Sequence, residues 1–341
     1  MLGIDPRAAR MAWTVFLVAL LLVVLYLVRT VVLVFVLAIL FAYMLSPVVN
    51  LIDRLLPGKR SRTYALAAVY TTLVGLLILA GVLVGNQVAQ EASNLASGKL
   101  QQTVQLRLQE PWPTWLEPLR QQLLERAQGL SAEVVSLARE VGAYFLVALS
   151  SLILVVLIPV LSFFFLKDGT ELRERVLALV KPEHRAMWDD IAGDVHVLLG
   201  RFIRALAILA LATLTFYGIF FAAIGLPYAL LLATIAGALE FIPMFGPVTA
   251  MAVVALVAIF SGFGHVVPIL AVLTAYRVFQ DYILSPHLMS SGVELHPLLV
   301  IFGALAGEEL AGIPGMFLSV PVMATLRVVY VRIRKVREME A

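Results

Sequence analysis

Long runs of apolar residues, separated by short polar stretches, dominate the hydropathy pattern of the chain. The first two runs cover residues 11–28 and 31–49, and a third extends from residue 64 to about 87. A helix needs about 20 apolar residues to cross the roughly 30 Å of hydrocarbon in a bilayer. The pattern therefore predicts three transmembrane helices within residues 1–87, and the first run is too long for the apolar part of a cleavable signal peptide.

Residues 88–142 differ in character, because polar and charged residues alternate with Val and Leu at helical spacing. This pattern predicts an extracytoplasmic helical insert. A fourth transmembrane helix is expected over residues 143–167, followed by cytoplasmic amphipathic helices over residues 168–202. The basic link 51–62 is expected in the cytoplasm by the positive-inside rule, which also places both termini there.

Proline and glycine interrupt the next apolar stretch, at residues 203–260. Pro243 and Pro247 lie four residues apart and flank Gly246. Each proline removes a backbone donor and disturbs the preceding turn, and the apolar halves on either side hold about 13 residues, or roughly 20 Å of helix. We expect a crossing helix followed by a broken, re-entrant hairpin, although a long kinked helix is the alternative.

The same layout recurs in residues 261–341. Gly237 follows Pro227 by ten residues and Gly307 follows Pro297 by ten, and in both cases carboxylates and an Ile-Pro pair come next. A second crossing helix, a second broken hairpin and a basic cytoplasmic tail are therefore predicted. One crossing separates the two hairpins, so their topology would be inverted, an arrangement with which secondary transporters build a midplane site. The predicted fold is all-α, a polytopic membrane protein of about eight membrane units.

Charged side chains within these apolar stretches are the candidate functional residues, because a charge at the centre of a membrane helix costs roughly 2.5 to 3.5 kcal/mol. Glu240 lies at the first break, where it could bind a solute or a proton, or only cap free amides. Glu308 and Glu309 are adjacent near the second break, and one of them is expected to bind a proton or to reach water.

Arg277 and Asp281 lie four residues apart on the helix before the second hairpin and can form an ion pair. With Gln280 beside them they would line a polar path, and an interfacial ion pair is the alternative. The residues predicted for the solute or ion pathway are Glu240, Pro243, Gly246, Arg277, Gln280, Asp281, Glu308 and Glu309.

Composition excludes several classes of protein. The 341 residues are 62% hydrophobic and 14% charged, which a water-soluble surface cannot accommodate. The net charge of +3 does not indicate nucleic-acid binding, because the basic residues cluster at the ends of apolar segments. There is no cysteine, the five histidines lack metal-ligand spacing, and no intramembrane catalytic motif occurs. We expect no metal, no cofactor and no enzyme activity.

Three stretches resemble the autoinducer-2 exporter family, and the likeness extends over nearly the whole chain. They are PVLSFFFLKDG at residues 159–169, LPYALLLATIAGALEFIPMFGP at 226–247 and QDYILSPHLMSSGVELHPLLVIFGALAGEELAGIPGMFLSVP at 280–321. The resemblance implies a permease of the bacterial inner membrane. Members of the family are linked to export of the signal autoinducer-2 or to sodium/proton antiport. It also implies homo-oligomers, with a pentamer as the family-level expectation.

Together these observations predict a secondary transporter that exports a small polar solute, with autoinducer-2 as the leading candidate, by alternating access. Sodium/proton antiport is the first alternative, and an oligomeric channel or structural membrane protein is the second. The expected partners are the lipid bilayer, a small solute or Na⁺ and H⁺, and further copies of the chain.

Overall fold

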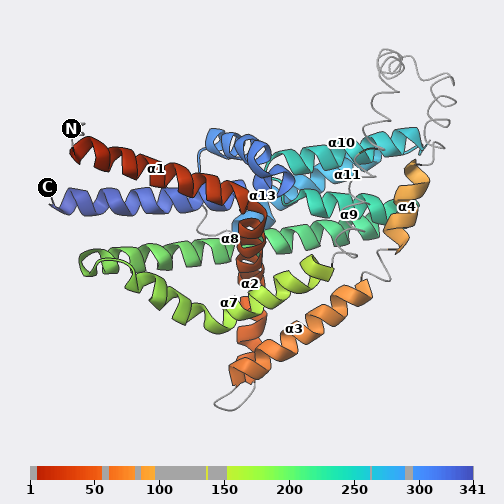
Figure 1. Ribbon diagram of the computed structural model, residues 1–341. Helices are drawn as coiled ribbons and strands as arrows, with labels where there is room; N and C mark the ends of the chain where they lie inside the picture. Colours follow the sequence, from red (N-terminus) through yellow and green to blue (C-terminus); the bar gives the residue numbers. More distant parts are fainter. Residues whose placement is uncertain are drawn as a thin grey trace.

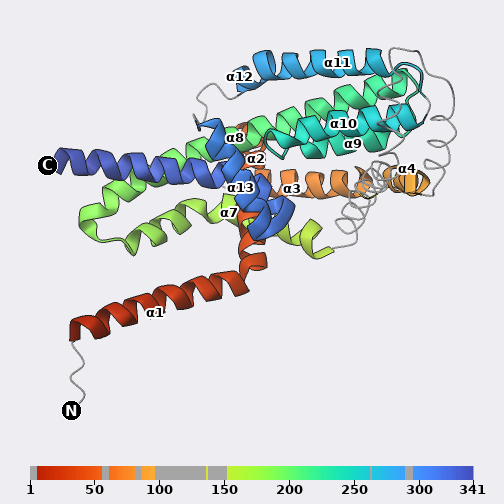
Figure 2. The ribbon, with the colours of Figure 1, turned by 90° about the horizontal axis from the view of Figure 1, so that it is seen from above.

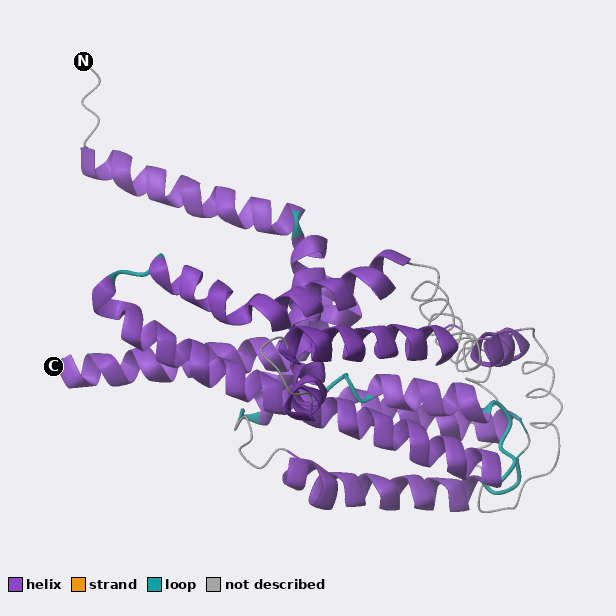
Figure 3. Ribbon diagram, turned by 90° about the horizontal axis from the view of Figure 1, so that it is seen from below, coloured by secondary structure: helices purple, strands orange, loops and turns teal. Residues whose placement is uncertain are grey.

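The computed structural model describes residues 6–55, 61–80, 86–96, 136, 152–261, 263–288 and 295–340. Every regular element in these ranges is helical (Figure 3), so the predicted all-α class is confirmed. Most of the predicted insert at 88–142 lies outside the described residues. The helices are α1 (Pro6–Leu27), α2 (Arg29–Leu55), α3 (Ser61–Ala80), α4 (Asn86–Ala96), α7 (Leu152–Ala178), α8 (Pro182–Ala223), α9 (Ala229–Leu239), α10 (Phe245–Phe260), α11 (Val266–Phe279), the π-helical turn η3 (Gln280–Leu284), α12 (Ser285–Leu288) and α13 (Pro297–Glu340).

Four helical stretches of the described residues are long and apolar enough to cross a membrane. They are Arg29–Leu55, Pro182–Ala223, Val266–Leu288 and Pro297–Lys335. Many large apolar side chains on these helices are exposed, and an apolar outer surface of this kind suits contact with lipid rather than water. The chain is therefore a multi-pass membrane protein.

Two helices run further than the hydropathy pattern predicts. The helix that contains the fourth apolar segment does not end with that segment near residue 167, because α7 continues through the charged residues that follow it to Ala178. The amphipathic stretch before residue 203 and the crossing helix after it form one helix, α8, of 42 residues. Pro182 occupies the first turn of α8, where a missing N–H costs nothing. No proline follows within α8, so the helix continues unbroken past residue 203. Only the distribution of polar and apolar residues around the helix changes there.

The buried apolar side chains form two separate cores. The first joins residues of α4, α8, α9, α10 and α11, and the second joins residues of α2, α3 and α7. Helices α8, α9 and α10 run in nearly the same direction, with α9 packed against both α8 and α10, and α2 crosses α8 (Figure 1). In the view from above, α11 follows the outer side of α10 and leads to α12, which contacts α8, and α1 projects away from the other helices (Figure 2).

Helices α9 and α10 form an antiparallel helical hairpin, which we call hairpin 1. They contain 11 and 16 residues, or about 16 and 24 Å of helix. The tight turn between them places Met244 at φ 64°, and the N–H of Phe245 donates to the carbonyl oxygen of Pro243 at 2.7 Å. Gly246 lies against the end of α9, since an added Cβ would be 2.7 Å from the carbonyl carbon of Leu239. The predicted first break is present.

The second break divides α13 into two arms, which we call hairpin 2. Ala311 and Gly312 have non-helical backbone angles, and Gly312 adopts φ 63°. A Cβ added at Gly303 would lie 3.4 Å from the Cβ of Ser319, sixteen residues along the chain. One continuous helix would separate these two positions by about 24 Å, so the chain folds back on itself. The arm before the break spans 14 residues, or about 21 Å, which is too short to cross a bilayer alone.

Candidate functional site

A cavity of about 150 Å³ lies where α8, the tip of hairpin 1, the α11–η3–α12 segment and the second arm of hairpin 2 meet. Its polar lining includes Glu240, Arg277, Gln280, Asp281 and Ser285, and its apolar lining includes Phe202, Leu206, Leu209, Pro243, Met244 and Val320. The rings of Phe241 and Phe317 meet edge to face, with centroids 5.5 Å apart, so the tip of hairpin 1 touches hairpin 2 directly. Both broken units therefore contribute to one recess.

Glu240 is the most buried charged residue of this cavity, with a side chain that is 8% exposed. It directly follows the last residue of α9 as the C-cap of that helix, so the break of hairpin 1 fixes its position. The hydroxyl of Thr213 on α8 donates to Oε1 of Glu240 at 3.1 Å, and Nη1 of Arg277 lies 3.5 Å from Oε2. A buried carboxylate is tolerated when charged and hydrogen-bonding partners surround it, and these two contacts supply them.

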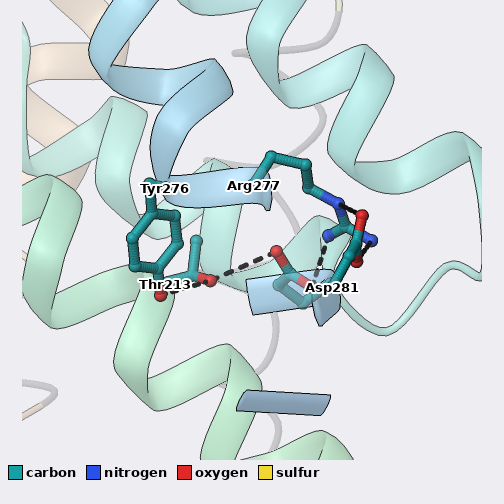
Figure 4. Close-up of polar contacts among 5 residues, drawn as sticks. Thr213, Tyr276, Arg277 and Asp281 are labelled. Carbon is teal, nitrogen blue, oxygen red and sulfur yellow. Dashed lines mark hydrogen bonds and ion pairs between the residues drawn. The ribbon is translucent and has the colours of Figure 1, made fainter. Parts of the chain in front are cut away.

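Arg277 connects Glu240 to Asp281. Its Nε donates to Oδ2 of Asp281 at 2.8 Å, and its Nη2 lies 2.6 Å from Oδ1, which is a two-point contact between one guanidinium and one carboxylate. Figure 4 shows this pair on one side of the cluster and Thr213 with Tyr276 on the other. The side chain of Asp281 is 45% exposed, so the cluster extends from a buried carboxylate to one that reaches the surface.

Gln280 contributes a buried amide that neighbours the Glu240 carboxylate without forming a well-aligned hydrogen bond to it. The residue is 1% exposed, and neither Oε1 nor Nε2 has a hydrogen-bond partner. It opens the π-helical turn that interrupts the helix between α11 and α12. Single π turns are frequent at functional sites, because they redirect side chains relative to the preceding helix. A buried amide with a free donor and a free acceptor can recognise a ligand that offers both groups.

Two hydroxyl groups in the cluster were not predicted from the sequence. Thr213 is 1% exposed on α8, and its Oγ1 lies 3.3 Å from the hydroxyl of Tyr276 on α11. Thr213 is a polar residue within an apolar membrane helix, and Tyr276 directly precedes Arg277. Both features could have indicated the contact, but hydroxyls are common in membrane helices and are a weak signal.

The remaining predicted pathway residues occupy different positions. Pro243 lines the cavity, whereas Gly246 packs behind it against the end of α9. Glu308 and Glu309 are exposed, close to the break of hairpin 2, and do not line the cavity. Within the described ranges, no group of three or more Asp, Glu or His residues is arranged to hold a metal ion.

The chain resembles known transport proteins over most of its length. A family model described as "AI-2E family transporter" matches residues 15–335. The proposed transport protein YrrI of Bacillus subtilis is 29% identical over 67% of this chain and 64% of its own length, slightly under two thirds. YueF of the same organism, also a proposed transport protein, is 24% identical over 87% of this chain and 83% of its own length. The proposed permease PerM of Escherichia coli K12 is 28% identical over 62% of this chain and 59% of its own length.

Proposed function

Since the chain belongs to the AI-2E transporter family, we propose that it is a secondary transporter that exports a small polar solute through the cavity around Glu240 by alternating access. Family membership places the chain among transporters rather than enzymes. Our proposal assigns it to the bacterial inner membrane with both termini in the cytoplasm, because the basic residues gather on the predicted cytoplasmic side.

One observation carries this proposal. The cavity lies between two broken hairpins and combines a buried ion pair with the unpaired amide of Gln280. Secondary transporters place solute and ion sites where interrupted helices of two repeats meet. The short lengths of α9, of α10 and of the first arm of hairpin 2 support re-entrant hairpins, and hairpin movement would then expose the cavity to one side of the membrane at a time.

The chemistry of the lining supports a small solute with several hydroxyl or carbonyl groups. Gln280 offers one donor group and one acceptor, while Arg277 donates and the carboxylates of Glu240 and Asp281 accept. A cavity of about 150 Å³ suits a molecule of that kind rather than a peptide or a lipid. Autoinducer-2 is the first solute to test, and assembly into homo-oligomers, with the pentamer as first expectation, belongs to the same proposal.

Flux from proteoliposomes tests the proposal. Purified protein is reconstituted into proteoliposomes, and these are loaded with labelled autoinducer-2 or with other small polyols. Solute efflux is then measured for the parent chain and for Gln280→Leu. The parent should release solute in a saturable manner, and Gln280→Leu should lower the affinity for the solute, because the buried amide is lost. Single-channel recordings in which many ions pass during each opening would refute alternating access.

Sodium/proton antiport is a second candidate, and Glu240 favours it. A carboxylate that is buried beside an arginine at a helix break can exchange a proton for a cation when the surrounding helices move. In the same proteoliposomes, an inward sodium gradient should then change the internal pH, and Glu240→Gln should abolish this response. A sodium-driven pH change without solute efflux would select antiport over export.

A further inference from the structure

Helix α9 begins without a cap from its own segment. The preceding residue, Tyr228, has a left-handed backbone with φ 61° and makes no side-chain capping bond. The first N–H groups of a helix have no partner within the helix and need one from elsewhere. Here Oε2 of Glu91, on α4, accepts the N–H of Leu231 at 2.9 Å. A residue 140 positions earlier in the chain therefore supplies the cap.

The Glu91 side chain is itself held in place. Its second oxygen accepts a hydrogen bond from Nε2 of Gln87, one turn earlier on α4, at 3.4 Å. On the same helix, Val88 and Ala92 are buried in the core that also contains Leu231 and Leu232. The carboxylate thus lies at the positive end of the α9 dipole, where a negative charge is stabilising, and apolar contacts on α4 keep it there.

The position of α4 in the fold makes this contact a link between α4 and hairpin 1. Helix α3 precedes α4 in the chain, but its buried residues belong to the core with α2 and α7, whereas α4 packs into the core of hairpin 1. Two helices that are successive in the described part of the chain, α3 and α4, therefore belong to different cores. Because α4 opens the predicted extracytoplasmic insert, a displacement of hairpin 1 must either carry α4 along or break the cap.

We propose that Glu91 is a positioning residue for transport, which ties the start of the insert to hairpin 1 through the amino end of α9 and makes α4 and the hairpin move together. The proposal rests on the transport function proposed above. Its consequence is selective: removing the cap should loosen hairpin 1, whose tip carries Met244, and leave hairpin 2, whose break is followed by Ile313, unaffected.

Labelling with a membrane-impermeant maleimide tests this selectivity in the full chain in proteoliposomes. The chain contains no cysteine, so single cysteines at Met244 and at Ile313 report on the two hairpins; both positions are about half exposed. Glu91→Ala should raise the labelling rate at the Met244 cysteine about fivefold, the ordinary effect of losing one helix cap. Labelling of the Ile313 cysteine should stay within about twofold of the parent rate.

Two variants serve as matched controls. Glu91→Gln keeps an acceptor oxygen at the same reach but loses the charge at the start of α9, so its rate should lie between those of the parent and Glu91→Ala. Gln90→Ala removes an exposed neighbour on α4 and should have no effect. If Glu91→Ala does not accumulate, Glu91→Asp makes the same test, because it keeps the charge but shortens the side chain. An unchanged rate at Met244, or an equal rise at both cysteines, would overturn the proposal. Labelling needs no transport, so a selective response without solute flux would reject the proposed function alone.

Discussion

Removing only the positive charge of Arg277 should destabilise the protein more than removing both charges of the Arg277–Glu240 pair. In Arg277→Gln, the Glu240 carboxylate keeps the Thr213 hydroxyl at 3.1 Å but loses its cation. Leaving one member of a buried ion pair uncompensated is costly, whereas replacing both members by neutral groups is often tolerated. The double variant Arg277→Gln/Glu240→Gln should therefore recover part of the lost stability.

The distance between Nη1 of Arg277 and Oε2 of Glu240 sets the size of this loss of stability. At 3.5 Å, two unit charges interact by about 5 kcal/mol with an effective dielectric constant of about 20. The side chain of Arg277 is 30% exposed and also pairs with Asp281, so water and the second carboxylate reduce the value. We expect the single variant Arg277→Gln to lose about 3 kcal/mol and the double variant about 1 kcal/mol.

Unfolding of the purified parent, both single variants and the double variant in one detergent gives the coupling energy of the cycle. Glu240→Gln alone should be nearly neutral, because Arg277 keeps its contact with Asp281, so losses of about 3 and about 1 kcal/mol for the other two variants give a coupling energy of about 2 kcal/mol in favour of the pair. Strictly additive effects, within about 0.5 kcal/mol, would refute the view that Arg277 neutralises Glu240. If the pair also serves transport, the double variant should stay inactive although its stability is partly restored.

Two further predictions concern packing. Gly307→Ala should separate the arms of hairpin 2 and cost about 1 to 3 kcal/mol, because its Cβ would lie 2.6 Å from the carbonyl carbon of Gly315. The control Gly75→Ala, in an open part of α3, should be neutral or slightly stabilising in the same thermal unfolding assay. Arg332→Ala should loosen the C-terminal end of α13 from α8, because it breaks the 2.6 Å contact with Asp194. Proteolysis of the tail should then become faster, whereas equal rates in the parent chain and the variant would contradict that contact.

The breaks in the fold could be predicted because proline acts on its own backbone. Pro243 lies in the turn between α9 and α10, as expected from its missing N–H. The second break was expected from the Ile-Pro pair that follows the carboxylates, Ile313-Pro314, but it lies just before this pair, at Ala311 and Gly312. Pro314 belongs instead to the first turn of the following arm, where the missing N–H is harmless. Gly312 is the residue that adopts the positive φ angle.

The site could be predicted only in part, because its members are joined by tertiary packing. Charges inside apolar segments pointed to Glu240, Arg277 and Asp281, which the fold brings together. The same argument selected Glu308, which lies exposed beside the break of hairpin 2. The contact of Glu91 with α9 has no local signal at all, since it joins positions 140 residues apart.

The central claim is that the two hairpins meet at one cavity. The most direct measurement is cross-linking, by a short bis-maleimide in native membranes, of cysteines placed at Phe241 and Phe317, whose rings are in contact. A pair at Phe241 and Leu326, which is exposed further along the second arm of hairpin 2, is the control. The account predicts rapid cross-linking within one chain for the first pair and little for the control. Equal cross-linking of both pairs, or none in the first, would contradict it.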